Sequence, residues 1–208
     1  RLERLAESAR SLLQVAAVIG RTFEFQLLHR ASGLGEDMTA EGVEELVRQR
    51  ALTGVGERLD FSHERIRDVV YSQLPSWRRK RFHQRIGEAI EALYTDNLEP
   101  HYEALGTHYR EAEAWEKAAV YLQRAGNKAV ARSAYRSAIG WFEEALTAVA
   151  HFPEGREKLE KAIAIRVDLA PALIATTSFS APEVGTTYVQ AYELCQRLGE
   201  TSMLFPVL

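Results

Sequence analysis

Apolar residues recur every three or four positions through most of the first 50 residues, which predicts three helices. The first helix is expected over 2–19 and ends at Gly20. The second is expected to begin at a Thr22 cap and to end near Gly33, and the third to begin at a Thr39 cap. The residues expected to face inward from the third helix are Val43, Leu46 and Val47.

Two short β-like runs follow, LTGV at 52–55 and LDFS at 59–62, and the three residues between them predict a hairpin. Helical spacing returns over 66–74 and again over 76–94. Three helices, a two-stranded hairpin and a further helix form the element order of a winged helix. The pattern therefore predicts a winged-helix domain over residues 1–98.

A boundary is expected at 96–100, Asp-Asn-Leu-Glu-Pro, and beyond it the pattern predicts helices with an internal repeat. The copies are WEKAAVYLQRA (115–125), YRSAIGWFEEA (135–145) and, more weakly, YVQAYELCQRL (188–198). An aromatic residue followed by small and large residues at these intervals is typical of tetratricopeptide helices, because the alanines let a neighbouring helix approach closely. One long helix over 115–133 is expected to serve two copies. We therefore expect a tetratricopeptide-like α-solenoid over 99–208.

Local signals near the end of the chain add three expectations. Ser180 and Glu183 have the spacing of a capping box that would start the last helix. Pro171 is expected to kink or break the helix around it. The chain begins at Arg1 without a methionine and ends in the apolar string MLFPVL, so we interpret it as a piece of a longer protein.

Composition and charge argue against several classes of partner. The 208 residues include 26 Lys and Arg against 29 Asp and Glu, a net charge of −3 that does not favour nucleic acid or a membrane surface. A lone cysteine, Cys195, excludes an internal disulfide and suits a cytoplasmic protein. No apolar run approaches the roughly 18 residues of a membrane span.

The basic run at 78–81, together with Arg85, raises the question of DNA binding. A winged helix usually reads the major groove with its third helix. That helix is expected to carry Glu41, Glu44 and Glu45, which would repel the phosphate backbone. We therefore interpret the basic run as a solvated face or as a patch that docks on an acidic neighbouring domain.

Motifs for catalysis or metal binding are not found. The sequence has no GxxxxGK[ST], and the glycine-rich run at 33–42 lacks a lysine. His101 and His108 lie two helical turns apart without a third ligand at a useful spacing. Cys195 is expected to be a packed thiol. We therefore expect no enzyme activity, no cofactor and no metal in this segment.

Five segments follow one another in an order found in a known family: LLQVAAVIGRTFEF, FSHERIRDVVYSQL, RRKRFHQRIGEAIEAL, HYREAEAWEKAAVYLQRAG and SAPEVGTTYVQAYELCQRLGE. Together they resemble one region of the STAND-type bacterial signalling ATPases, which are often fused to an adenylate or guanylate cyclase, a kinase or a DNA-binding domain. The resemblance covers essentially the whole chain. It implies a winged helix that follows the ATPase core, a tetratricopeptide array that binds a protein partner, and ATP or ADP in the parent protein.

Ser62-His63-Glu64 acquires a role within this resemblance. It is similar to the Met-His-Asp motif of related animal and plant STAND ATPases, which touches the β-phosphate of ADP and holds the inactive state. The histidine matches, whereas Ser and Glu depart from the motif. A helix N-terminus favours an anion, so His63 is a candidate ADP-phosphate contact in the parent. Alternatively, His63 is a hydrogen-bonded histidine at the edge of the core, on the face of Ile66 and Val70.

Three functions remain open. The first, implied mainly by the resemblance, is a regulatory segment in which residues 1–98 contact an upstream nucleotide-binding domain and couple its state to the array. The second is a winged-helix transcription regulator, which would need basic residues on the third helix. The third is a free-standing tetratricopeptide adaptor in which residues 1–98 only cap the array; deletion of those residues would leave its ligand binding intact.

Overall fold

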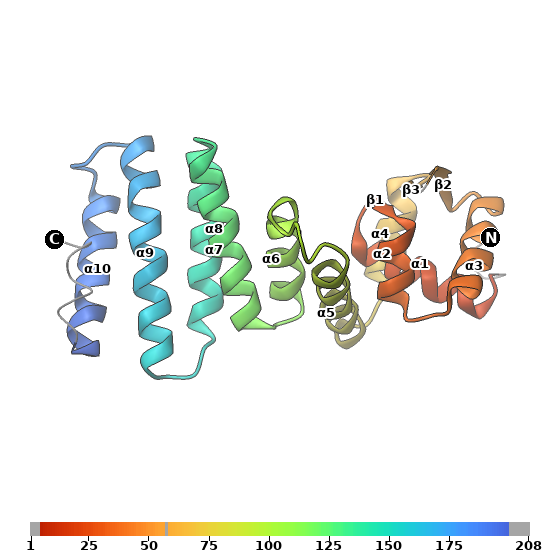
Figure 1. The fold of residues 1–208 in the computed structure, drawn as a ribbon, viewed down its shortest axis with the longest axis horizontal. Helices are drawn as coiled ribbons and strands as arrows, with labels where there is room; N and C mark the ends of the chain where they lie inside the picture. The colour runs from red at the N-terminus through yellow and green to blue at the C-terminus, as the bar shows by residue number, and fades with distance from the viewer. Residues whose placement is uncertain (1–4, 57, 200–208) are drawn as a thin grey trace. The chain divides into compact units, whose positions relative to one another are not determined.

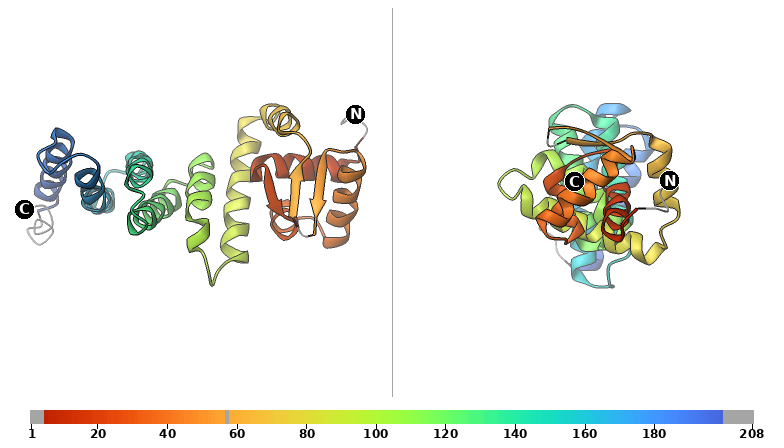
Figure 2. Two further views of the ribbon diagram at one scale, coloured as in Figure 1. Left: turned by 90° about the horizontal axis from the view of Figure 1, so that it is seen from above. Right: turned by 90° about the vertical axis from the view of Figure 1, so that its right-hand side faces the viewer.

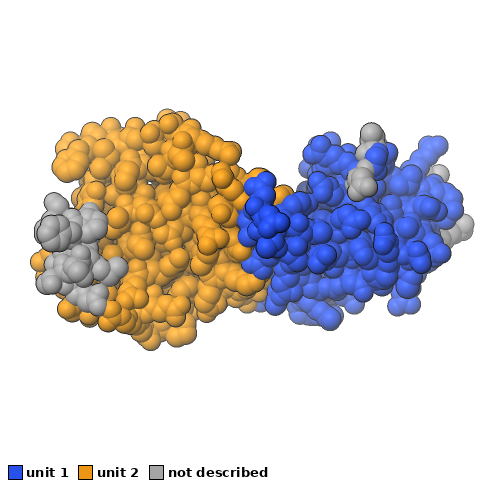
Figure 3. All heavy atoms as spheres, viewed as in Figure 1, with its two compact units in different colours: residues 1–98 blue, residues 99–208 orange. Residues whose placement is uncertain are grey.

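The computed structural model describes residues 5–56 and 58–199, which are mainly helical with a small three-stranded antiparallel sheet (Figure 1). The chain divides into two compact units, unit 1 (residues 1–98) and unit 2 (residues 99–208), coloured separately in Figure 3. The division falls within the segment 96–100 that the sequence marks as a boundary. No helix in the described residues is both long enough and apolar enough to cross a membrane.

Unit 1 is built around its first helix, α1 (Glu7–Ile19), which is apolar on several sides and is therefore surrounded by other elements. The helices that pack against it are α2 (Phe25–Ser32), α3 (Glu36–Arg48), α4 (Glu64–Ser72) and α5 (Ser76–Leu93). Its buried residues are Ala9, Leu12, Leu13, Val15, Ala16, Ala17 and Val18. The helices predicted over 66–74 and 76–94 are confirmed as α4 and α5, within two residues at each end.

The sheet of unit 1 has the strand order β1–β3–β2, and all its pairings are antiparallel (Figure 2, left). Its strands are β1 (Thr22–Glu24), β2 (Leu52–Val55) and β3 (Arg58–Phe61). The hairpin predicted from the sequence is confirmed as β2 and β3. The third strand was not predicted; in it, the buried Phe23 lies opposite Leu59 of β3.

Two helix caps predicted from the sequence are wrong. Thr22 lies in β1, where its hydroxyl donates a hydrogen bond to Asp60, and α2 begins three residues later. Thr39 lies inside α3, fully buried, and its hydroxyl donates to the carbonyl oxygen of Gly35 at 2.9 Å. Val47, which was predicted to face inward, is 40% exposed. Each threonine thus satisfies its hydroxyl with an acceptor that the sequence pattern does not reveal.

Unit 2 is an array in which each helix packs against the next along the chain (Figure 1). Its elements are η2 (Glu99–His101), α6 (Tyr102–Glu111), α7 (Trp115–Ala131), α8 (Tyr135–Ala150), α9 (Arg156–Thr176) and α10 (Pro182–Leu198). The three copies of the repeat lie in α7, α8 and α10. The long helix predicted over 115–133 is α7.

Small residues bring α6, α7 and α8 close together. A Cβ atom added to Gly106 of α6 would lie 2.8 Å from a methyl carbon of Leu122 in α7. A Cβ atom added to Gly126 of α7 would lie 2.5 Å from the ring of Phe142 in α8, which is fully buried. These two glycines lie outside the three copies of the repeat. The small residues of the copies in α7 and α8 are fully buried, as the spacing predicted: Ala118, Ala125, Ala138 and Ala145.

Three helices end in the same kind of turn. Arg50, Glu113 and Ser133, which follow α3, α6 and α7, have φ angles of 57°, 59° and 57°. In each turn the amide of the next residue donates to the carbonyl oxygen five positions earlier, at 2.8–2.9 Å. This is the Schellman arrangement, in which the left-handed position usually holds glycine.

The structure bears on two expectations for the last helices, the capping box and a break at Pro171. The final helix begins at Pro182 with Ala181 as its N-cap, and no side chain caps it, so Ser180 does not form the predicted capping box. Helix α9 continues through Pro171 without a break, because packing against α8 and α10 outweighs the loss of one backbone hydrogen bond. The apolar string at 203–208 lies outside the described residues.

Candidate functional site

His63 stands at the N-cap of α4, where the chain passes from β3 into the helix. Its backbone is extended, with φ −145° and ψ 132°, and its carbonyl oxygen accepts the amide of Ile66 at 3.0 Å. Its side chain is exposed and makes no capping hydrogen bond. The exposed side chain does not fit the alternative of a hydrogen-bonded histidine at the edge of the core.

The residues beside His63 leave polar atoms unsatisfied. Ser62 Oγ and Arg67 Nε are buried and have no hydrogen-bond partner within the described part of the chain. The other end of the Arg67 guanidinium, Nη1, lies 4.0 Å from Glu64 and 3.9 Å from Asp68. An exposed imidazole at the start of a helix can contact an anion supplied by another domain, whereas the buried Nε of Arg67 is not accessible to it.

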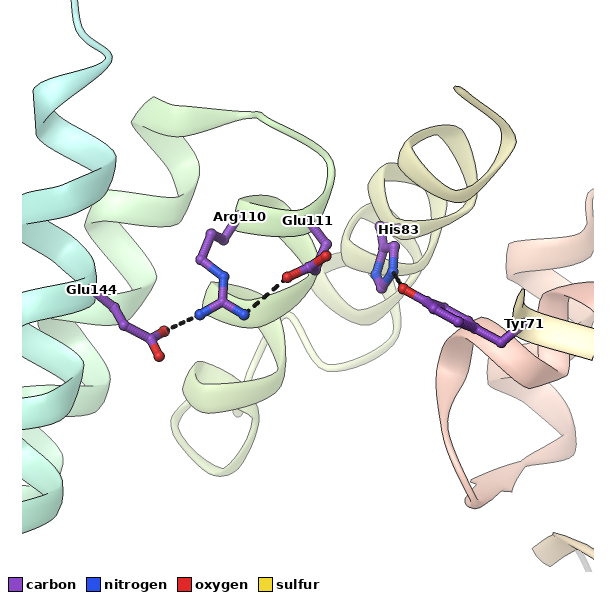
Figure 4. Close-up of polar contacts among 5 residues, drawn as sticks. All are labelled: Tyr71, His83, Arg110, Glu111 and Glu144. Carbon is purple, nitrogen blue, oxygen red and sulfur yellow. Dashed lines mark hydrogen bonds and ion pairs between the residues drawn. The ribbon is translucent and has the colours of Figure 1, made fainter. Parts of the chain in front are cut away.

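A buried histidine that sequence reasoning missed links α4 to α5. His83 of α5 is 5% exposed, and its Nε2 lies 3.3 Å from the hydroxyl oxygen of Tyr71 in α4 (Figure 4). The Arg79 guanidinium lies 5.3 Å from the centre of the Tyr71 ring. The sequence did carry a signal that His83 is buried, since this residue lies next to Phe82 and one turn before Ile86, which are both apolar and buried. The pair couples the position of α4, which His63 precedes as the N-cap, to that of α5.

In unit 2, three tyrosine rings of α6 and α7 lie against one another near a cation, and two of them, Tyr109 and Tyr121, are buried. The rings of Tyr109 and Tyr121 are stacked with their centres 5.8 Å apart, and Tyr102 lies 6.1 Å from Tyr121. The exposed Arg124 places its guanidinium 5.6 Å from the centres of both Tyr102 and Tyr121. We call this group, with Lys161 of α9, the tyrosine–arginine surface.

Helix α9 extends this surface with charged groups. Asp168 accepts hydrogen bonds from Gln123 Nε2 at 2.6 Å and Asn127 Nδ2 at 3.1 Å. Burial and then the charge of Arg124 lower the pKa of Lys161, while Asp168 opposes the change. Two cations therefore lie close enough to repel each other, and a carboxylate brought by a partner would relieve that repulsion.

An ion-pair network spans α6 and α8. Arg110 Nη1 lies 2.5 Å from Glu144 Oε2, and its Nη2 donates to Glu111 at 2.9 Å (Figure 4). All three side chains are 32–41% exposed, so solvent screens the charges and the network orients the helices more than it stabilises them.

The remaining chemical candidates are dispersed or buried. Cys195 is buried, and its burial raises the pKa of the thiol, which confirms the packed thiol expected from the sequence. His108 is buried in α6, whereas His101 lies in the preceding 3₁₀ helix. Within residues 5–56 and 58–199, three or more His, Cys, Asp or Glu side chains do not come together as a metal site.

Comparison with known proteins assigns no family to this chain. No family model and no solved structure match the chain. The chain is similar to the uncharacterized protein R02095 of Rhizobium meliloti (strain 1021), with 26% identity over 219 residues. The match covers 100% of this chain and 21% of that protein, so the chain spans about a fifth of the length of the relative it matches.

Proposed function

We propose that this chain is a non-catalytic, cytoplasmic regulatory segment of a larger signalling ATPase of the STAND type. In this proposal unit 1 is a winged helix and unit 2 is the beginning of a tetratricopeptide-like solenoid. The observation that carries the proposal is the element order, in which α1–α3, the β2–β3 hairpin and α4 precede an array of helices joined by a recurring small-residue repeat. The much greater length of the relative supports a place in a larger protein.

Unit 1 would sense the nucleotide held by an upstream domain of the same protein. His63 is exposed at the start of α4, so its imidazole can approach the phosphate of ADP bound to that domain. A phosphate drawn to this helix start would fix the position of α4. The Tyr71–His83 contact would then pass the position of α4 on to α5. We expect no DNA binding, because Glu41, Glu44 and Glu45 make α3 acidic.

Unit 2 would carry the partner. Each helix of a solenoid contacts only its neighbours, which leaves a continuous surface free for a ligand. The tyrosine–arginine surface presents the exposed Arg124 and the half-buried Lys161, and the buried rings of Tyr109 and Tyr121 lie beneath. We therefore expect a protein partner with acidic side chains on the segment that it presents.

The test uses the parent protein expressed with the coding sequence upstream of Arg1. The dissociation constant of ADP is measured for the native protein, for His63→Ala and for Gln73→Ala, a control at the far end of α4 whose side chain is exposed. Loss of one charge-assisted hydrogen bond, about 1.5–3 kcal/mol, weakens ADP binding roughly 10- to 100-fold in His63→Ala. Gln73→Ala should bind as the native protein does. Equal ADP affinity for all three proteins would contradict the role of His63.

A further inference from the structure

A cleft in unit 1 gathers positive charge that the proposed function does not use. It has a volume of about 510 Å³ and lies between α1 and α5. Four arginines line it: Arg10 from α1, and Arg78, Arg81 and Arg85 from α5. Glu7 is the one acidic residue of its lining, so the described lining carries a formal charge of +3.

The three arginines of α5 lie on one face of the helix, since they are separated by three and four residues. Like charges at this spacing destabilise a helix, and two of them lack direct compensation. Among the residues described, neither Arg81 nor Arg85 forms an ion pair. Burial and then the charge of Arg81 lower the pKa of Arg85, with Glu88 opposing. The chain therefore keeps repelling cations together where a ligand could neutralise them.

Other groups hold the cleft in shape. Arg78 Nη1 donates to Gln14 Oε1 at 3.2 Å, which joins α5 to α1 across the cleft. Arg85 lies against the backbone at Gly33, where a Cβ atom would be 2.3 Å from its guanidinium nitrogen. Trp77, which is 59% exposed, also lines the cleft, and the Arg78 guanidinium lies 5.3 Å from the centre of its ring. The cations are thus set on helices and partly fixed before a ligand arrives.

We propose that this cleft binds a small ligand through a diphosphate group. Guanidinium groups match phosphate oxygens in pairs, and arginine is the residue most suited to such contacts. A charge of +3 complements the charge of a diphosphate, and the volume falls within the usual range for small-ligand sites, about 300–1,000 Å³. An acidic peptide would space its carboxylates along an extended chain, whereas the arginines gather within two turns of α5.

The site is independent of the nucleotide contact proposed for His63. His63 starts α4 and does not line the cleft, which belongs to α1 and α5. His63→Ala should therefore leave diphosphate binding unchanged, and failure of one proposal does not affect the other.

The test is calorimetric titration of the 208-residue chain with inorganic pyrophosphate at low salt. One saturable site is expected. Arg81→Gln removes an exposed cation of the cleft and should weaken binding about tenfold or more, and Arg78→Gln should do the same. Glu7→Gln removes the one carboxylate of the lining and should strengthen binding. Arg48→Gln, a matched control on the exposed end of α3, should leave it unchanged.

Two further titrations identify the source of the diphosphate. If the natural ligand is a nucleotide, ADP should bind more tightly than pyrophosphate, and Trp77→Ala should weaken ADP alone. If it is inorganic, Trp77→Ala should weaken neither. The proposal is overturned if Arg81→Gln binds pyrophosphate as the native chain does, or if Arg48→Gln weakens binding equally. It is also overturned if pyrophosphate does not bind while an oligo-glutamate peptide does, since the cleft would then be a protein-docking site.

Discussion

Replacing Gly126 by alanine sets two energies of opposite sign against each other. Alanine favours the helix by about 1 kcal/mol over glycine. At this position, however, the new Cβ would lie 2.5, 2.7 and 2.8 Å from three ring atoms of Phe142, whose side chain is 0% exposed and has no open space to move into. Overpacking of this kind costs about 1–3 kcal/mol. We therefore expect a net loss of ~1 kcal/mol, with the steric cost winning.

Gly140 provides the matched control. It lies exposed within α8, and a Cβ there would meet no atom within 4 Å. Gly140→Ala should therefore stabilise the protein by about 0.5–1 kcal/mol. The two glycine-to-alanine changes have the same chemistry and opposite predicted signs.

The assay is urea unfolding followed by tryptophan fluorescence. In a Trp77→Phe background the two remaining tryptophans, Trp115 and Trp141, both lie in unit 2, so the signal reports that unit alone. Stability then follows from the midpoint and slope of the transition. Comparison at a constant slope separates a change in stability from a change in the denatured state.

A second background tests the cause. In Phe142→Leu the ring is absent, so Gly126→Ala should lose most of its penalty, and the coupling between the two sites should be about 1 kcal/mol. The reasoning fails if Gly126→Ala is as stabilising as Gly140→Ala. It also fails if the penalty is the same with and without the ring of Phe142.

Three further outcomes are expected. Burial and then a 2.9 Å hydrogen bond to Glu24 raise the pKa of Tyr94 from 10.0 to about 12. The stabilisation from this hydroxyl is therefore complete below pH 10 and is lost as the pH rises to about 12. The tyrosinate absorbance of the native and Tyr94→Phe proteins, compared across this pH range, should differ by one late-titrating group. Cys195 should react with a thiol reagent only when urea unfolds the chain, because burial raises the pKa of its thiol, and fast reaction of the folded protein would contradict its burial. Lys128, which is 7% exposed, lies 2.8 Å from Glu103, which is 37% exposed. Because the carboxylate of Glu103 can be rehydrated when its partner is removed, Lys128→Met should lower the free energy of unfolding in urea by only about 1 kcal/mol.

Most helices of this chain could be predicted because they carry their own apolar period, which is weak only in α9 among the helices described. The repeat in α7 and α8 also indicated which positions are small, and its alanines, Ala118, Ala125, Ala138 and Ala145, are fully buried. Gly126 lies one residue beyond the copy in α7, and its contact with Phe142 was not predicted. Strand β1 could not be predicted in the same way. It has three residues, and only Phe23 is buried, so its existence depends on pairing with Leu59 far along the chain.

The candidate site was predictable only in part. The motif singled out His63, but periodicity could not place its side chain, because the strand pattern ends and the helix pattern begins at that residue. The Tyr71–His83 contact joins two helices, and neither residue alone indicates the pair. Likewise, the basic run in α5 could be seen in the sequence. The cleft could not, because it forms only where α1 packs beside α5 and contributes Arg10.

The turns after α3, α6 and α7 have a consequence for how this protein could adapt to heat. Arg50, Glu113 and Ser133 occupy left-handed backbone positions that cost a residue other than glycine roughly 1–2 kcal/mol. Glycine at Glu113 or Ser133 would relieve that strain while leaving every packed helix face unchanged. Each such substitution is therefore expected to raise the thermal stability of the protein, so a lineage moving to a warmer habitat could adapt one turn at a time.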